Sequence, residues 1–233
     1  MDPRHLCVDE RLLGTCVYCG REPDTRDHVP SKVFLDNPLP DNIPVVEACA
    51  ACNQGFSLDE EYLACLLECV LCGTVDTEVL HRDKVKHILA EKPLLAARLR
   101  ESRRTMEDGC VTWMPDEDRV RNVVLKLARG YAAYELSLPQ LDDPLRVLVA
   151  PVLCMAEAEL DEFERAGAGE LRAWPEIGSR AFLRACGAKP YPNQNGHWVR
   201  VQGDRYRYCV DQHGGVLVRI VIAEYLACSV EWE

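Results

Sequence analysis

Residues 16–56 read CVYCGREPDTRDHVPSKVFLDNPLPDNIPVVEACAACNQGF, and this segment constrains the fold more than any other part of the chain. It begins with one Cys-x-x-Cys pair, ends close behind another, and carries five prolines between them. A segment so rich in turn residues has little capacity to build a core of its own. We therefore expect short strands and loops that are held together by something other than buried apolar side chains.

The two cysteine pairs supply what this segment lacks. Each pair offers two thiolates, and the four together fill the tetrahedron that zinc prefers. A bound zinc ion would replace the missing core, because metal binding then becomes folding free energy. A site closed by four thiolates has no open position and is structural, not catalytic. We predict such a zinc site, against the alternative of four buried thiols, at Cys16, Cys19, Cys49 and Cys52.

Polar residues with a recognisable order lie between and behind the cysteine pairs. Thr25-Arg26-Asp27-His28-Val29-Pro30 follows the first pair, Asn42 precedes the second, and Asn53 comes directly after Cys52. This order resembles the HNH endonucleases, the ββα-metal family, in their zinc-bound form. The motif covers about a fifth of the chain. QGFSLDEEYL (54–63) and KLARGYAAYEL (126–136) also resemble segments that follow the motif in a group of bacterial HNH proteins.

The resemblance implies a role for each of these residues. His28 would be the general base that deprotonates a water for attack on phosphorus, and Asn42 would hold the loop that orients it. Asp27 would bind a divalent metal ion, Mg²⁺ or in its place Mn²⁺. Asn53 would be the second ligand, where many family members have His. The chemistry agrees, since hard cations prefer oxygen ligands and a neutral His is a suitable base near pH 7.

Some neighbouring residues have two readings. One of Asp59, Glu60 and Glu61 would join the metal shell, directly or through water, or all three would simply lie at a helix N-terminus, where acidic residues are favoured. Cys65, Cys69 and Cys72 have the spacing of an iron–sulfur motif, but on an apolar helix they share one face, so we expect core packing. The scattered histidines are expected at the surface or in turns: His81, His87, His197 and His213.

Composition narrows the class of protein. The chain has 233 residues, 48% of them hydrophobic, and no apolar run long enough to span a bilayer. The first residues lack the pattern of a signal peptide. We therefore expect a cytoplasmic protein without membrane contact. Its thirteen cysteines are then expected in metal sites and in the core, not in disulfides.

The charge is unevenly distributed. A net charge of −11 argues against a general nucleic-acid coat. Residues 82–104, however, hold 8 Lys/Arg and 3 Asp/Glu, a net charge of +5. These basic residues would either line a DNA path or form a solvated helix face, and sequence leaves both readings open.

The remaining periodicity predicts an α+β fold. Helices are expected over 57–72, 77–89, 93–104 and 118–137, and strands over 146–155, 197–210 and 216–232 with turns at 202–204 and 213–215. We expect three segments. Residues 1–75 form a zinc-bound ββα-metal (HNH) nuclease module, 76–140 a helical region, and 141–233 an α+β region with an antiparallel sheet.

The leading hypothesis is a metal-dependent HNH endonuclease that hydrolyses phosphodiester bonds in DNA, as a restriction or phage-defence effector. Such an effector would work with a partner protein or as a homo-oligomer. The alternative is a non-catalytic zinc module that binds nucleic acid or a protein. RNA as the substrate, or a role as a toxin, stays open as well, because the metal centre reads phosphate and not sugar.

Overall fold

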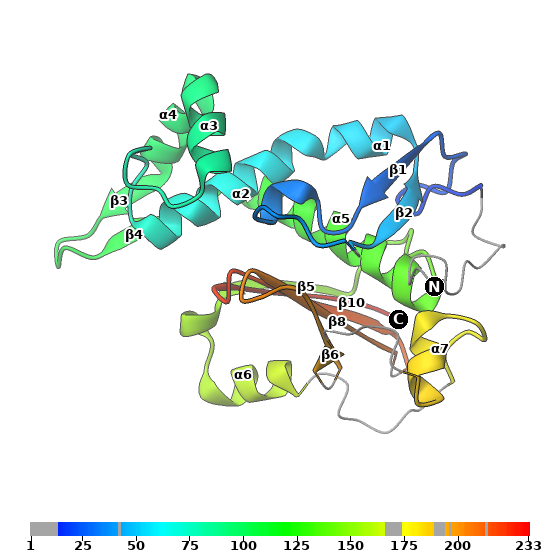
Figure 1. The fold of residues 1–233 in the computed structure, drawn as a ribbon. Helices are drawn as coiled ribbons and strands as arrows, with labels where there is room; N and C mark the ends of the chain where they lie inside the picture. Colours follow the sequence, from blue (N-terminus) through cyan, green and yellow to red (C-terminus); the bar gives the residue numbers. More distant parts are fainter. Residues whose placement is uncertain (1–13, 42, 166–173, 189–193, 196, 213) are drawn as a thin grey trace. The chain divides into compact units, whose positions relative to one another are not determined.

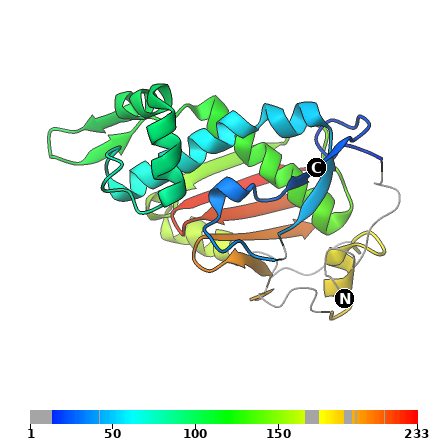
Figure 2. The same cartoon turned by 45° about the horizontal axis from the view of Figure 1, so that its top comes forward.

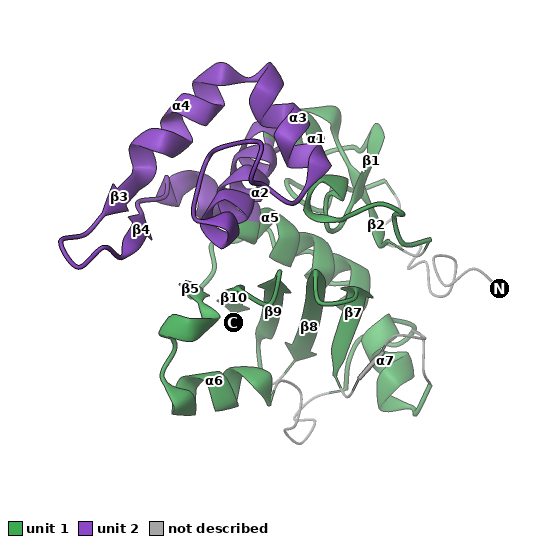
Figure 3. Cartoon of the chain, turned by 60° about the vertical axis from the view of Figure 1, so that its left-hand side comes forward, with its two compact units in different colours: residues 1–55, 124–233 green, residues 56–123 purple. Residues whose placement is uncertain are grey.

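A computed structural model describes residues 14–41, 43–165, 174–188, 194–195, 197–212 and 214–233. The chain forms two compact units, one from residues 1–55 and 124–233 and the other from residues 56–123 (Figure 3). The boundaries of these units differ from those of the three segments expected from the sequence. The described part is a mixture of helices and antiparallel strands, which confirms the α+β class.

The first unit begins with a small hairpin. Strand β1 (Thr25–His28) pairs antiparallel with β2 (Val45–Ala48), so that His28 lies opposite Val45. A short 3₁₀ helix, η3 (Lys32–Phe34), lies in the connection, and helix α1 (Ala50–Gly55) follows β2 after one residue. The cysteine-bounded segment therefore folds as strand, strand and helix.

A six-stranded antiparallel sheet forms the centre of the remaining part of this unit, as expected for the C-terminal part. Its spatial order is β5-β10-β9-β8-β7-β6. The strands are β5 (Arg146–Pro151), β6 (Gln194–Asn195), β7 (Trp198–Gln202), β8 (Tyr206–Gln212), β9 (Val216–Ile222) and β10 (Leu226–Trp232). The turn expected at 202–204 connects β7 to β8; His213, in the second expected turn, lies outside the described residues.

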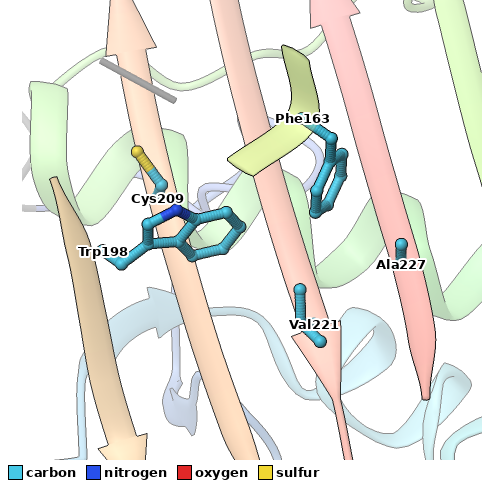
Figure 4. Close-up of a cluster of buried hydrophobic side chains, with 5 residues drawn as sticks. All are labelled: Phe163, Trp198, Cys209, Val221 and Ala227. Atoms are coloured by element: carbon cyan, nitrogen blue, oxygen red, sulfur yellow. The ribbon is translucent and has the colours of Figure 1, made fainter. Parts of the chain in front are cut away.

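Helices cover both faces of the sheet. Tyr131 of α5 (Glu117–Leu136) stacks on Tyr208 of β8, with 3.8 Å between the ring centroids. On the other face α6 (Glu157–Glu164) packs through Phe163 (Figure 4). Successive side chains of a strand point to opposite faces, so Tyr208 and its neighbour Cys209 serve the two different layers. The buried cluster under α6 consists of Phe163, Trp198, Cys209, Val221 and Ala227. The unit also contains η4 (Val152–Cys154) and α7 (Arg180–Ala185).

The second unit is mainly helical. It contains α2 (Ser57–Cys72), α3 (Asp83–Glu91), α4 (Pro93–Ser102) and a hairpin of β3 (Arg103–Thr105) and β4 (Val111–Trp113), together with residues 117–123 of α5 (Figure 1). Gly73 ends α2 in the left-handed conformation, with φ of 68°, as its position after the helix predicted.

The helix expected over 77–89 begins later than predicted. The backbone carbonyl of Asp76 accepts a hydrogen bond from the Val79 amide, and its carboxylate accepts one from the Glu78 amide. This local bonding forms a turn in place of the first helical turn, so α3 starts at Asp83. Within the described residues, no helix has both the length and the apolar character needed to cross a bilayer.

Candidate metal centre

The four predicted zinc ligands lie together. The sulfur atoms of Cys16, Cys19, Cys49 and Cys52 are all within 4.8 Å of one another. The sulfurs of Cys19 and Cys49 are 3.7 Å apart. Two sulfurs that each lie about 2.3 Å from one zinc ion, at the tetrahedral angle, are about 3.8 Å apart. The cluster can therefore hold a structural metal ion such as zinc.

Backbone hydrogen bonds build both halves of this cluster. The first pair lies in a tight turn in which the Gly20 amide donates to the Cys16 carbonyl at 2.8 Å, and Gly20 adopts a positive φ of 73°. The Val17 amide donates to the Glu47 carbonyl and so ties the turn to β2. Cys52 lies within α1, directly after β2, so the helix and the hairpin present the four sulfurs to one point.

The thiols differ in their electrostatic environment. Arg21 donates a hydrogen bond from Nε to the sulfur of Cys19 at 3.4 Å, and this contact lowers the pKa of Cys19 to about 6. Burial raises the pKa of Cys16 and of Cys52. The lowered pKa favours the thiolate of Cys19, and the thiolate is the form that ligates metals.

Asp27, the predicted ligand of the catalytic metal, is buried and already has two partners. Its Oδ2 accepts a hydrogen bond from the Tyr18 hydroxyl at 2.7 Å and lies 2.7 Å from Lys126 Nζ. Lys126 also donates to Ser31 Oγ at 2.9 Å. Tyr18 and Lys126 were not identified from the sequence as site residues. Lys126 begins the segment 126–136, which resembles a segment downstream of the HNH motif. That resemblance alone did not indicate what Lys126 contacts.

His28 and Asn53 approach the same strand from different elements. His28 follows Asp27 on β1 and is half-buried, and its side chain points to the opposite face of the strand. Asn53, from α1, donates from Nδ2 to Thr25 Oγ1 and to the Arg26 carbonyl, both at 3.3 Å. The structure therefore brings α1 back onto the strand that carries the predicted base. Asn42 lies outside the described residues.

Helix α5 fits closely against the loop that follows β1. A Cβ atom added at Gly130 would lie 2.6 Å from Val29 Cγ2, which is well inside van der Waals contact. Val29 itself is fully buried. The part of α5 from residue 124 to 136 thus lies between the hairpin and the six-stranded sheet (Figure 1 and Figure 2), and it supplies both Gly130 and Lys126 to the site.

The acidic residues behind Asn53 have partners within their own unit. Glu61 lies 2.7 Å from Lys92 Nζ, and Asp59 lies 2.6 Å from Arg119 Nε. Glu60 is buried. These contacts give Glu61 and Asp59 a structural role at the start of α2.

The basic residues of 82–104 differ in their surroundings. Lys86 and Lys92 form ion pairs with acidic residues, and Arg82 is buried. Arg100 and Arg103, in contrast, line an open hollow of about 540 Å³ together with Thr74, Val75, Asp76 and Thr77. Arg98 and Arg104 are also exposed to solvent.

Comparison of the chain with protein-family models, with curated proteins and with solved structures gave no significant match. Its function must therefore be argued from the geometry above.

Proposed function

We propose that the chain is a metal-dependent HNH endonuclease that hydrolyses phosphodiester bonds in DNA. One observation carries the proposal: β1, β2 and α1 follow one another around the four-cysteine cluster, and α1 returns Asn53 to the strand that holds Asp27 and His28. A strand–strand–helix unit with these side chains is the arrangement that the sequence resemblance implies. We assign zinc to the cluster as the structural metal.

The side chains have chemically suitable roles for hydrolysis. His28 would accept the proton of a water molecule that attacks the phosphorus atom. The carboxylate of Asp27 and the amide oxygen of Asn53 are hard oxygen donors of the kind that Mg²⁺ and Mn²⁺ prefer. When bound, such an ion would neutralise charge on the scissile phosphate.

The contacts of Asp27 constrain how this ion is held. Both the Tyr18 hydroxyl and the Lys126 ammonium meet Oδ2 of Asp27. A divalent ion would bind through Oδ1 or would take the place of Lys126. While Lys126 stays in place, it balances the charge of the buried Asp27 carboxylate.

Plasmid cleavage tests the proposal. The wild type, His28→Ala and the matched control His87→Ala are incubated with supercoiled DNA and Mg²⁺ or Mn²⁺. His87 is an exposed histidine on α3 that pairs with Glu91. A general base contributes about 10²–10⁴-fold to a rate, so His28→Ala should lose at least about 100-fold while His87→Ala cleaves like the wild type. Equal nicking by all three proteins, or no cleavage of any nucleic acid by the wild type, would overturn the assignment.

A non-catalytic zinc module is the second candidate, and one observation favours it. A buried Asp with a lysine and a tyrosine on one oxygen is also what a purely structural carboxylate looks like. The cleavage assay separates the two candidates. Repeating it with single-stranded and double-stranded RNA identifies the sugar that the enzyme accepts. A role in restriction or phage defence stays a prediction.

A further inference from the structure

Three different metal-ligating side chains meet at the end of α2, in the unit formed by residues 56–123. They are Glu68, Cys72 and His81, whose ligand atoms all lie within 4.8 Å of one another. Glu68 and Cys72 are one helical turn apart and share a face of α2. His81 belongs to the loop that precedes α3.

The distances within this group match those of ligands around one ion. The sulfur of Cys72 lies 3.5 Å from His81 Nδ1 and 3.6 Å from Glu68 Oε1. A sulfur about 2.3 Å and a nitrogen or oxygen about 2.0 Å from one zinc ion, at the tetrahedral angle, are about 3.5 Å apart. Both separations therefore agree with shared coordination.

The Glu68 carboxylate holds the loop that carries His81 by accepting hydrogen bonds from its backbone. The amides of His81 and Arg82 donate to Glu68 Oε1 at 2.7 Å and 2.9 Å. Glu68 is 2% exposed, whereas His81 is exposed to solvent. The group is thus fixed on its protein side and accessible on its other side, where a water molecule can complete a tetrahedron.

We propose that Glu68, Cys72 and His81 bind a zinc ion, or a similar transition-metal ion, at a site separate from the four-cysteine cluster. Sulfur and imidazole ligands favour zinc and cobalt over Mg²⁺ or Ca²⁺. Three protein ligands and one open position form an open site, unlike the closed site of four thiolates. The ion would join the end of α2 to the loop before α3.

Cys72 and His81 were not expected to lie next to each other. Cys72 was expected in the core with Cys65 and Cys69. His81 was expected at the surface or in a turn and not as a ligand, and it is indeed exposed in the loop before α3. Cys65 and Cys69 are fully buried as expected, but Cys72 is partly exposed at the last position of α2 and contacts His81. The site depends on a contact across the turn from residue 73 to 80, which helical periodicity does not reveal.

The test counts metal ions on the full-length chain, isolated with the metal it carries. The wild type, His81→Ala, Cys72→Ala and the control His87→Ala are dialysed against the same buffer of chelator-controlled free zinc, and zinc per chain is measured by elemental analysis. We expect His81→Ala and Cys72→Ala to bind about one zinc ion fewer than the wild type, because each lacks a ligand. His87→Ala should bind as much as the wild type.

The difference in zinc content between the variants and the wild type reports on this site, whereas the total zinc content also includes the four-cysteine cluster. The result is therefore independent of that cluster and of DNA cleavage. Circular dichroism checks that His81→Ala is folded, which its exposure favours. After chelator has removed the zinc from this site, added cobalt should give the wild type more thiolate charge-transfer absorption than Cys72→Ala, by the contribution of one thiolate. Equal zinc in the wild type and His81→Ala would overturn the proposal and leave Glu68 as a loop-holding carboxylate only.

Discussion

The carboxylate of Asp27 and the ammonium of Lys126 form an ion pair of 2.7 Å in which the lysine side chain is 1% exposed and the aspartate side chain 9%. The pair joins the strand of the candidate site to α5. Removing one partner of a buried ion pair leaves the other charge without compensation, at a cost of about 3–5 kcal/mol. The charge of Asp27 is therefore balanced by a residue of α5, which lies far along the chain from β1.

Replacing Lys126 with methionine tests whether Asp27 can bind a divalent ion. Lys126→Met keeps the bulk of the side chain but removes the charge, so we expect the free energy of unfolding to fall by about 3–5 kcal/mol in metal-free buffer. Mg²⁺ should then restore more stability to the variant than it adds to the wild type, as measured by urea unfolding. The control Lys86→Met, which breaks an exposed pair with Asp83, should cost less than about 1 kcal/mol. Absence of any Mg²⁺ effect on the stability of the variant would contradict Asp27 as a ligand.

Gly130 is expected to be intolerant of even one methyl group. Gly130→Ala would drive its Cβ into the buried side chain of Val29, and overpacking of this kind costs about 1–3 kcal/mol. Because Val29 follows His28, cleavage should fall as well. Gly55→Ala is the control, since a Cβ at that position of α1 meets nothing within 4 Å. Thermal unfolding compares the two variants, and similar midpoints would show that the loop moves aside without cost.

The four-cysteine cluster was predictable because its evidence is local. Ligand type and spacing fix what the cysteine pairs can do, whatever the rest of the chain contributes. Lys126 and Gly130 offered no such evidence. On an amphipathic helix a lysine is expected in solvent, and a helical glycine carries no sign of its neighbour. Their roles exist only once α5 has packed against the loop after β1.

The turn between β9 and β10 shows a different limit of sequence reasoning. Residues 216–232 gave one expected strand region without a turn, because no Gly, Asn or Pro interrupts it. In the structure Ala223 and Glu224 form the turn, with positive φ values of 57° and 47°. Two interactions are made around this unfavourable turn. β9 pairs with β10, and Glu224 contacts Arg207 at 2.9 Å.

Two glycine substitutions separate these contributions to the turn. A left-handed backbone costs a non-glycine residue about 1–2 kcal/mol, and a glycine at the same position avoids this cost. Glycine loses more conformational entropy on folding, which cancels about 0.5–1 kcal/mol of that gain. We expect Ala223→Gly to be more stable than the wild type by about 0.5 kcal/mol in urea unfolding. Glu224→Gly has the same backbone relief but loses the contact with buried Arg207, so it should be less stable than Ala223→Gly by about 1–3 kcal/mol. Equal stability of the two variants would show that the Arg207 contact contributes nothing.

Loss of one cysteine of the cluster should open the hairpin. Cys49→Ser removes a thiolate ligand, and where metal binding supplies folding free energy a missing ligand loosens the segment it holds. We expect about one zinc ion fewer per chain than in the wild type, faster hydrogen exchange of the β1 and β2 amides, and loss of DNA cleavage. Amides of β8 and β9, inside the six-stranded sheet, should exchange as slowly as before, because buried sheet packing protects them without the metal.

Cys110→Ser, at an exposed cysteine outside the cluster, is the control and should leave zinc content and exchange unchanged. A Cys49→Ser protein with full zinc content and a protected hairpin would show that the four thiols are a packed cluster and not a metal site.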